Sequence, residues 1–370
     1  MPIATRSTMP SSTPAAEFFA AYLQDSVTQK LDLNAFVWPE GLRPETSSGG
    51  QFSNDVPEID ISAAMLAKNE GVRAAVAAKI SKAAKEWGFF RIVNHGLPPD
   101  MMSRAERQAH KFFALQLDQK RRAAGSSSNP FGYAAAGPSR AIMRSWHETL
   151  YMLCNHARID NLANKVWPSA KEASDRKEFC MALSDYTTAM NKLGLQLLEL
   201  LLQGLGVDRN KLTRHYSVEG SSSARINFYP PCPKPDVTFG LPPHTDSGTL
   251  TILHQDAVGG LQVCRNGKWI GVQPKPNSFI VNIGDCLQVW SNNIYKSVEH
   301  RALVNSSRAR MSLAFFYNPT DDTIVAPIKE LTSAKTPAVY KPFSWAEYRL
   351  YAGTHKSKVL NAIDHFKVRQ

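Results

Sequence analysis

The sequence has little of what marks secreted, membrane or nucleic-acid-binding proteins. Its 370 residues hold only five cysteines, an odd number without CxxC spacing, which argues against a disulfide framework or a zinc site and favours a reducing compartment. No apolar run approaches the roughly 20 residues that span a bilayer. The 43 basic residues outnumber the 32 acidic ones but form no run of five, so this excess favours small anionic ligands over nucleic acid.

The N-terminus also lacks a secretory signal, because "MPIATRSTMPSSTPAA" has no apolar segment. Its Ser, Thr and single Arg are compatible with a plastid transit peptide, although we favour a short disordered tail. The sequence has no visible internal repeat. We therefore expect a cytoplasmic monomer that acts on small molecules, without a nucleic-acid or membrane partner.

The patterns along the chain predict four segments. Residues 1–53 are rich in Pro, Gly and Ser and are expected to be disordered or loosely packed, whereas residues 54–216 are mostly helical. Residues 217–321 contain short strands rich in Val, Ile and Phe, separated by Gly, Pro and Asn. Residues 322–370 end in helical patterns. The sequence predicts an α+β fold whose double-stranded β-helix (jelly roll) core is flanked by N-terminal and C-terminal helices.

Single elements are predicted from periodicity and from breaker residues. Residues 70–87 have the pattern of an amphipathic helix, and a second helix is expected from about Met101 to Arg122. The stretch 123–140 has the composition of a loop. Residues 278–290, "SFIVNIGDCLQVW", are expected to form a strand.

A candidate metal site begins in "PPHTDSGTLTILHQD", where His244 and Asp246 interrupt an apolar strand pattern. Residues two apart in a strand face the same side, so both side chains can hold one ion. His300, at the start of a later strand, is the candidate third ligand. Two histidines and a carboxylate on one face form the facial triad of non-haem Fe(II) oxygenases, which leaves positions open for a chelating cosubstrate and O2.

Two alternatives compete with this triad. His254 shares strand parity with His244, but nothing later in the chain supports it as a ligand. A His-X-Asp pair alone is also more often a surface pair or a satisfied core histidine than a metal site.

A second site favours the metal interpretation. In "RARMSLAFF", Arg310 and Ser312 lie two apart among apolar residues, where a buried guanidinium needs a partner. That partner is either a structural Asp or Glu, or a ligand carboxylate gripped by the guanidinium fork and the Ser hydroxyl. A dicarboxylate that also chelates the metal fits this arrangement, and we infer 2-oxoglutarate (2OG).

The chain resembles the plant 2OG/Fe(II)-dependent dioxygenases over about residues 54–350. The resemblance rests on the segments "WGFFRIVNHG", "NFYPPCPKPD", "PHTDSGTLTILHQDAVGGLQV", "VNIGDCLQVWSNNIYKSVEHRALVN" and "RARMSLAFF". It implies Fe(II) at His244, Asp246 and His300, with no catalytic residue beyond the metal centre. It also implies a 2OG pocket built from Asn227, Tyr229, Arg310 and Ser312.

The nearest pattern within that family is the gibberellin oxidases of the 20-oxidase and C20 2-oxidase types. "FVWPEGLRP", "FGYAAAG", "SWHETL" and "LTILHQDAVGGLQV" carry this likeness, although Arg144-Ser145-Trp146-His147 stands where the 20-oxidases have Leu-Pro-Trp-Lys. The resemblance implies hydroxylation of a gibberellin-type diterpenoid acid, with release of succinate and CO2. The alternatives are a flavonoid or other phenolic substrate, or a jelly roll that binds ligands without turnover. Candidate substrate residues are Phe131, Tyr133, Arg140, Arg144, Trp146 and Phe316.

Overall fold

A computed structural model describes residues 33–44, 52–66, 69–126, 129–135, 144–216, 221–355 and 361–368. Its helices are α2 (Ser62–Leu66), α3 (Glu70–Glu86), α4 (Pro99–Phe113), α5 (Leu117–Arg121), α6 (His156–Val166), α7 (Ala173–Gly204), α8 (Asp285–Trp290) and α9 (Trp345–His355). None of the helices described is long and apolar enough to cross a membrane. The strands are β1 (Phe52–Ser53), β2 (Glu58–Asp60), β3 (Phe89–Val93), β4 (Gly132–Ala135), β5 (Glu148–Leu153), β6 (Ser223–Tyr229), β7 (Phe239–His244), β8 (Leu250–Gln255), β9 (Leu261–Arg265), β10 (Lys268–Val272), β11 (Ser278–Ile283), β12 (His300–Leu303), β13 (Arg310–Tyr317), β14 (Ile324–Val325) and β15 (Phe343–Ser344).

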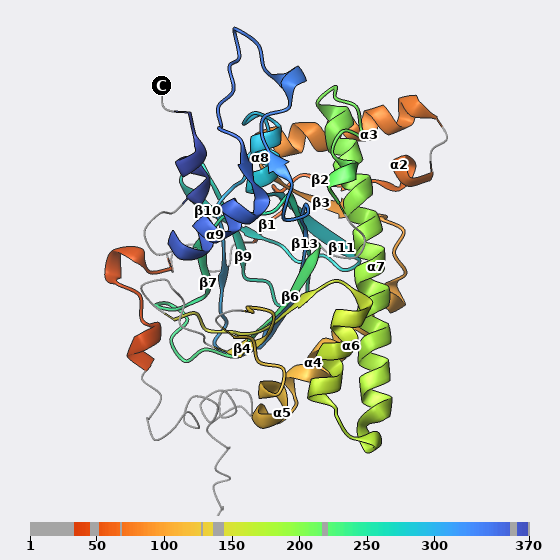
Figure 1. The fold of residues 1–370 in the computed structure, drawn as a ribbon. Coiled ribbons are helices and arrows are strands. Elements are labelled where there is room, and N and C mark those ends of the chain that lie inside the picture. The colour runs from red at the N-terminus through yellow and green to blue at the C-terminus, as the bar shows by residue number, and fades with distance from the viewer. Residues whose placement is uncertain are drawn as a thin grey trace, which may run out of the picture.

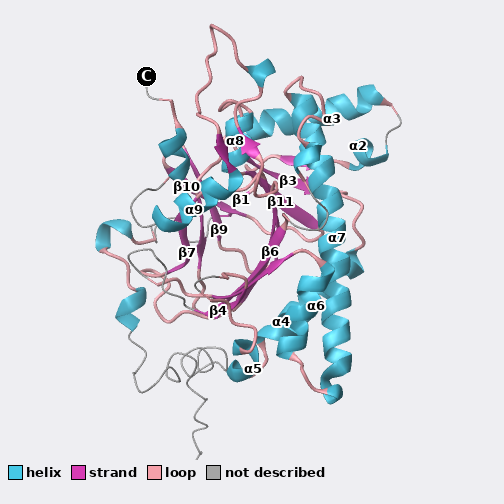
Figure 2. Cartoon of the chain, in the orientation of Figure 1, coloured by secondary structure: helices cyan, strands magenta, loops and turns pink. Residues whose placement is uncertain are grey.

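Two sheets form the core of the fold. One has the strand order β1-β10-β9-β12-β7, and the other has the order β2-β3-β11-β8-β13-β6-β5-β4. Apart from the parallel pairs β1–β10 and β2–β3, neighbouring strands are antiparallel. They form the predicted double-stranded β-helix, with most of the helices along one side (Figures 1 and 2).

The two faces of the larger sheet have different surroundings. On β13, Met311, Leu313 and Phe315 belong to the main apolar core together with residues of α4, α6 and α7. The long helix α7 runs the length of this side (Figure 1). Because side chains alternate along a strand, Arg310 and Ser312 face the smaller sheet. We call this face, toward the smaller sheet, the inner face.

A smaller apolar cluster fills part of the space between the sheets. It includes Trp87, Phe89, Val263 and Ile280. The candidate polar residues occupy the inner face beyond this cluster.

Several predicted elements differ from the structure. The helix expected over 101–122 divides into α4 and α5, since buried Lys120 turns back to donate to the Phe113 carbonyl at the end of α4, at 3.1 Å. The stretch expected to be a loop contains β4, which extends the larger sheet by pairing with β5. Residues 54–216 thus contribute strands as well as helices.

The strand expected over 278–290 also stops early, at Ile283, and α8 follows. At Gly284 the chain approaches Gly248 so closely that a Cβ would lie 2.2 Å from the Gly248 carbonyl oxygen. The first amides of α8 then bond the loop between β7 and β8. This long-range contact overrides the local apolar pattern.

The described part of the N-terminal segment is packed on the body of the protein. Phe36 and Trp38 are buried, and their rings contact Trp146 and Phe239 edge-on. The remainder of the segment expected to be disordered or loosely packed, apart from residues 33–44 and 52–53, lies outside the described residues.

Candidate metal centre

Three side chains converge between the two sheets. β7 ends at His244, and β12 begins at His300, which pairs with His244 across the sheet. Asp246 lies two residues past the end of β7, in a loop and not within the strand as predicted. Its carboxylate oxygens lie 3.7 Å from His244 Nε2 and 3.6 Å from His300 Nε2. One ligand atom from each residue lies within 4.8 Å of the others, as one shared ion requires.

The surrounding hydrogen bonds suit both histidines for metal binding. His244 Nδ1 lies 2.8 Å from the Pro242 carbonyl oxygen, and His300 Nδ1 lies 3.2 Å from that of Val298. If each Nδ1 is protonated and donates to its carbonyl, the lone pair of each Nε2 atom can bind a metal ion.

The carboxylate of Asp246 is held in its charged form. Burial by itself raises its pKa, but His300 and His244, together with hydrogen bonds from Thr251 and Asn282, outweigh burial and bring the pKa below its usual value. Thr251 Oγ1 donates at 2.5 Å and Asn282 Nδ2 at 2.8 Å. An oriented anion between two imidazoles is therefore ready to accept a divalent cation.

The residues predicted to bind 2OG form a continuous patch on the inner face of the larger sheet. Arg310 lies opposite Tyr229, and Ser312 lies opposite Asn227 on one side and Gln255 on the other. Gln255 was not a sequence candidate, because only the register of β8 places it there.

Arg310 itself fits a carboxylate ligand. Its side chain is 2% exposed, with its Cζ 4.9 Å from the Tyr229 ring centroid. Nη2 donates to Gln255 Oε1 at 3.3 Å, whereas Nε and Nη1 are buried and have no hydrogen-bond partner among the described residues. Unpaired buried donors are costly, and a ligand carboxylate would satisfy both.

The candidate substrate residues are dispersed. Phe316 faces inward and pairs with Thr251, which donates to Asp246. The Phe131 ring lies 4.6 Å from that of Tyr151, a residue on the inner face of β5. Arg144 is exposed, and its backbone N–H bonds the Ala35 carbonyl.

Two candidates do not line the space between the sheets, and one cannot be placed. Tyr133 is on the helix side, where its hydroxyl donates to Glu148 at 2.6 Å; the register of β4 forces this orientation. Trp146 is packed against Phe36 and donates to the Pro230 carbonyl. Arg140 lies outside the described residues.

The structure also reveals an inner-face cation that the sequence interpretation missed. Arg225 lies between Ala314 and Tyr151 in the sheet, with its Cζ 4.5 Å from the Tyr151 ring centroid. Its Nε is buried without a hydrogen-bond partner among the described residues. Parity with Asn227 and Tyr229 in "SARINFYP" was the signal available in the sequence.

The competing histidine lies elsewhere. His254 is on β8 opposite Leu313, which places it on the helix side of the sheet. Its Nε2 is 3.8 Å from Glu106 Oε2 of α4. It therefore cannot join His244 at one ion.

Two family models match the chain: the 2OG-Fe(II) oxygenase superfamily over residues 220–319, and the non-haem dioxygenase in morphine synthesis N-terminal over residues 56–170. Gibberellin 20 oxidase 1 of Arabidopsis thaliana is 36% identical over 335 residues, covering 90% of this chain and 87% of that protein. The chain belongs to the 2OG-Fe(II) oxygenase superfamily. Jasmonate-induced oxygenase 4 of Arabidopsis thaliana is 39% identical over 321 residues, covering 85% of this chain and 87% of that protein. The crystal structure of JOX2 in complex with 2OG, Fe and JA has a TM-score of 0.79 and 33% identity, covering 95% of this chain and 97% of that one.

Membership of this superfamily makes the protein a 2OG- and Fe(II)-dependent dioxygenase. When bound, iron and 2OG supply the oxidising chemistry, in which O2 oxidises the substrate while 2OG is converted to succinate and CO2. The part of the protein in this chemistry would be to supply metal ligands, orient the reactants and exclude water.

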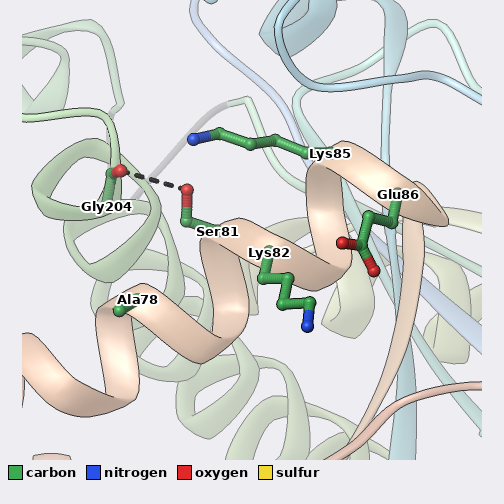
Figure 3. Close-up of a pocket in the computed structure, with 6 residues that line it drawn as sticks. All are labelled: Ala78, Ser81, Lys82, Lys85, Glu86 and Gly204. Carbon is green, nitrogen blue, oxygen red and sulfur yellow. Dashed lines mark hydrogen bonds between the residues drawn. The ribbon is translucent and has the colours of Figure 1, made fainter.

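A surface hollow elsewhere has no part in this chemistry. It lies between α3 and the end of α7, has a volume of about 290 Å³, and contains none of the residues predicted to bind the metal or 2OG. The side chains of Lys82 and Lys85 stand at its rim, and Ser81 donates to the Gly204 carbonyl inside it (Figure 3). Exposed lysines at a surface hollow are ordinary solvated side chains.

Proposed function

We propose that this dioxygenase hydroxylates an unactivated carbon of a small apolar carboxylic acid, with gibberellin-type diterpenoid acids as the first class to test. In this proposal Arg310 and Ser312 bind the far carboxylate of 2OG, and Asn227 and Tyr229 line its pocket. Fe(II) is held by His244, Asp246 and His300.

Arg225 is the observation that carries the substrate class. It lies on the inner face of β6, two residues from Asn227, and no described acidic residue forms an ion pair with it. Its surroundings are aromatic, since the Tyr151 and Phe131 rings are in contact. A cation in an aromatic pocket suits an apolar skeleton bearing one carboxylate. We therefore propose Arg225 as the cation that binds the substrate carboxylate, which we call the substrate clamp. Of the two arginines expected from the sequence, Arg144 is exposed and Arg140 lies outside the described residues.

The similar proteins support a carboxylic acid as the substrate class but do not identify which acid. Gibberellin 20 oxidases and jasmonate-induced oxygenases resemble the chain at similar identity, and JOX2 has been crystallised with JA. A jasmonate is therefore a second candidate, and a flavonoid is the alternative that does not need Arg225.

A panel of gibberellin precursors, a jasmonate and flavanones, each with Fe(II) and 2OG, tests the proposal by mass spectrometry and succinate release. We expect hydroxylation of an acid and strong loss of binding for its methyl ester, because the ester leaves the guanidinium unpaired. Equal turnover of acid and ester, or activity confined to flavanones, would refute it.

Two single-residue variants test whether Arg225 binds the substrate carboxylate. Arg225→Met keeps side-chain bulk but removes the charge, and we expect kcat/KM for the acid to fall by about tenfold to a hundredfold, the value of a charged hydrogen bond. The matched control is Arg144→Met, which removes an exposed arginine and should change little. An unchanged preference for acid over ester in Arg225→Met would exclude Arg225 as the clamp.

A further inference from the structure

The start of α8 forms backbone hydrogen bonds with the loop that carries Asp246. The Asp285 N–H donates to the Asp246 carbonyl at 2.8 Å, and the Cys286 N–H donates to the Gly248 carbonyl at 3.0 Å. Gly284 adds a bond to the Thr249 carbonyl at 2.9 Å. These hydrogen bonds fix the backbone of the metal-binding loop relative to residues 284–286.

The Asp285 side chain extends this connection to the C-terminal helix. Its Oδ2 accepts from Thr245 Oγ1, which lies between His244 and Asp246 in the chain, at 3.3 Å. The same oxygen accepts from the Tyr348 hydroxyl of α9 at 2.5 Å. Asp285 and Tyr348 are 2% and 0% exposed, so water does not compete for either contact.

Tyr348 is itself fixed by aromatic packing. Its ring lies 5.3 Å from Phe343 and 5.7 Å from Phe366, measured between centroids. The C-terminal segment thus places the Tyr348 hydroxyl against Asp285, the residue that contacts the metal-binding loop.

We propose that Tyr348 is a positioning residue for the iron centre: through Asp285, it holds the loop of Thr245 and Asp246 in the geometry that binds Fe(II). This inference rests on the proposed iron ligands. Removing hydrogen-bond partners behind metal ligands typically weakens metal binding by 10–100-fold. Since Tyr348 acts through two intervening groups, we expect the lower end of that range.

The test is Tyr348→Phe, which deletes only the hydroxyl. Anaerobic calorimetry should show an Fe(II) dissociation constant raised roughly tenfold, while the KM for 2OG at saturating iron stays near that of the parent protein. Tyr340→Phe is the matched control, because the buried Tyr340 hydroxyl accepts from Gln288 of α8 and donates to Asn293, which follows α8. It should cost similar stability in urea denaturation and leave Fe(II) affinity unchanged.

A second variant, on the loop side of Asp285, keeps the inference testable if Tyr348→Phe proves unstable. Thr245→Val removes the hydroxyl by which the metal-binding loop donates to Asp285, and by itself it should raise the Fe(II) dissociation constant. Where both variants fold, we expect their effects on Fe(II) affinity to be less than additive. Equal Fe(II) affinity in the parent protein, Tyr348→Phe and Tyr340→Phe would overturn the inference and leave Tyr348 a structural residue. Absence of Fe(II) binding in the parent protein would refute the proposed ligands instead.

Discussion

Replacing Arg310 by lysine probes the 2OG site most sharply. The guanidinium is buried, with two nitrogens unpaired by described residues and a third bonded to Gln255. Lysine keeps the positive charge but cannot place two donors on one carboxylate. Losing that fork costs on the order of 2 kcal/mol, which corresponds to roughly thirtyfold weaker 2OG binding.

The assay is the KM for 2OG from succinate release, supported by anaerobic calorimetry of 2OG with the iron-loaded protein. The KM for the substrate should change little. Arg301→Lys is the matched control, because Arg301 is equally buried but stacks on Trp269, with its Cζ 4.0 Å from that ring centroid, on the outer face of the smaller sheet. Unchanged 2OG dependence in Arg310→Lys, or an equal change in Arg301→Lys, would refute the reasoning.

Two further predictions concern buried contacts, one on the helix side of the larger sheet and one beside Tyr229. Lys120→Met should lower the free energy of unfolding by about 3–5 kcal/mol in urea denaturation. Lys120 Nζ lies 2.6 Å from the fully buried Glu148 carboxylate, and the substitution would leave that charge without its partner. Adding Glu148→Leu should recover much of that loss, and failure to do so would contradict this account. Gly240→Ala should raise the KM for 2OG without changing Fe(II) affinity, since the new Cβ would lie 2.6 Å from the Tyr229 ring; an unchanged KM would place Tyr229 outside the 2OG pocket.

The site was predictable where it depends on local parity. Arg310 and Ser312 lie on one strand face because alternation is a property of the extended chain itself. A jelly roll could bring the strand of His300 beside that of His244, and the structure pairs these two residues. Asp246 was chosen on the same parity, yet it lies beyond the strand end, and its position depends on contacts with α8.

Long-range packing explains what the sequence did not reveal. α8 replaces the second half of the strand expected over 278–290 because the chain turns at Gly284 against Gly248. These two glycines are far apart in sequence. Gln255 became visible only through strand register, which sets cross-strand neighbours that no local pattern specifies. Arg225, by contrast, shares strand parity with Asn227 and Tyr229, and that signal was present in the sequence. Tyr133 shows the converse, because an aromatic residue in a stretch expected to be a loop is part of the core once β4 pairs with β5.

The most direct test of the central claim is the Fe(II) content of the protein after anaerobic equilibrium dialysis, compared between His300→Ala and His254→Ala. We expect ~1 iron per chain in the parent protein and in His254→Ala, and loss of iron binding with retained folding in His300→Ala, as a three-ligand facial site requires. Iron retained in His300→Ala and lost in His254→Ala would contradict the assignment of His244, Asp246 and His300 as the metal centre.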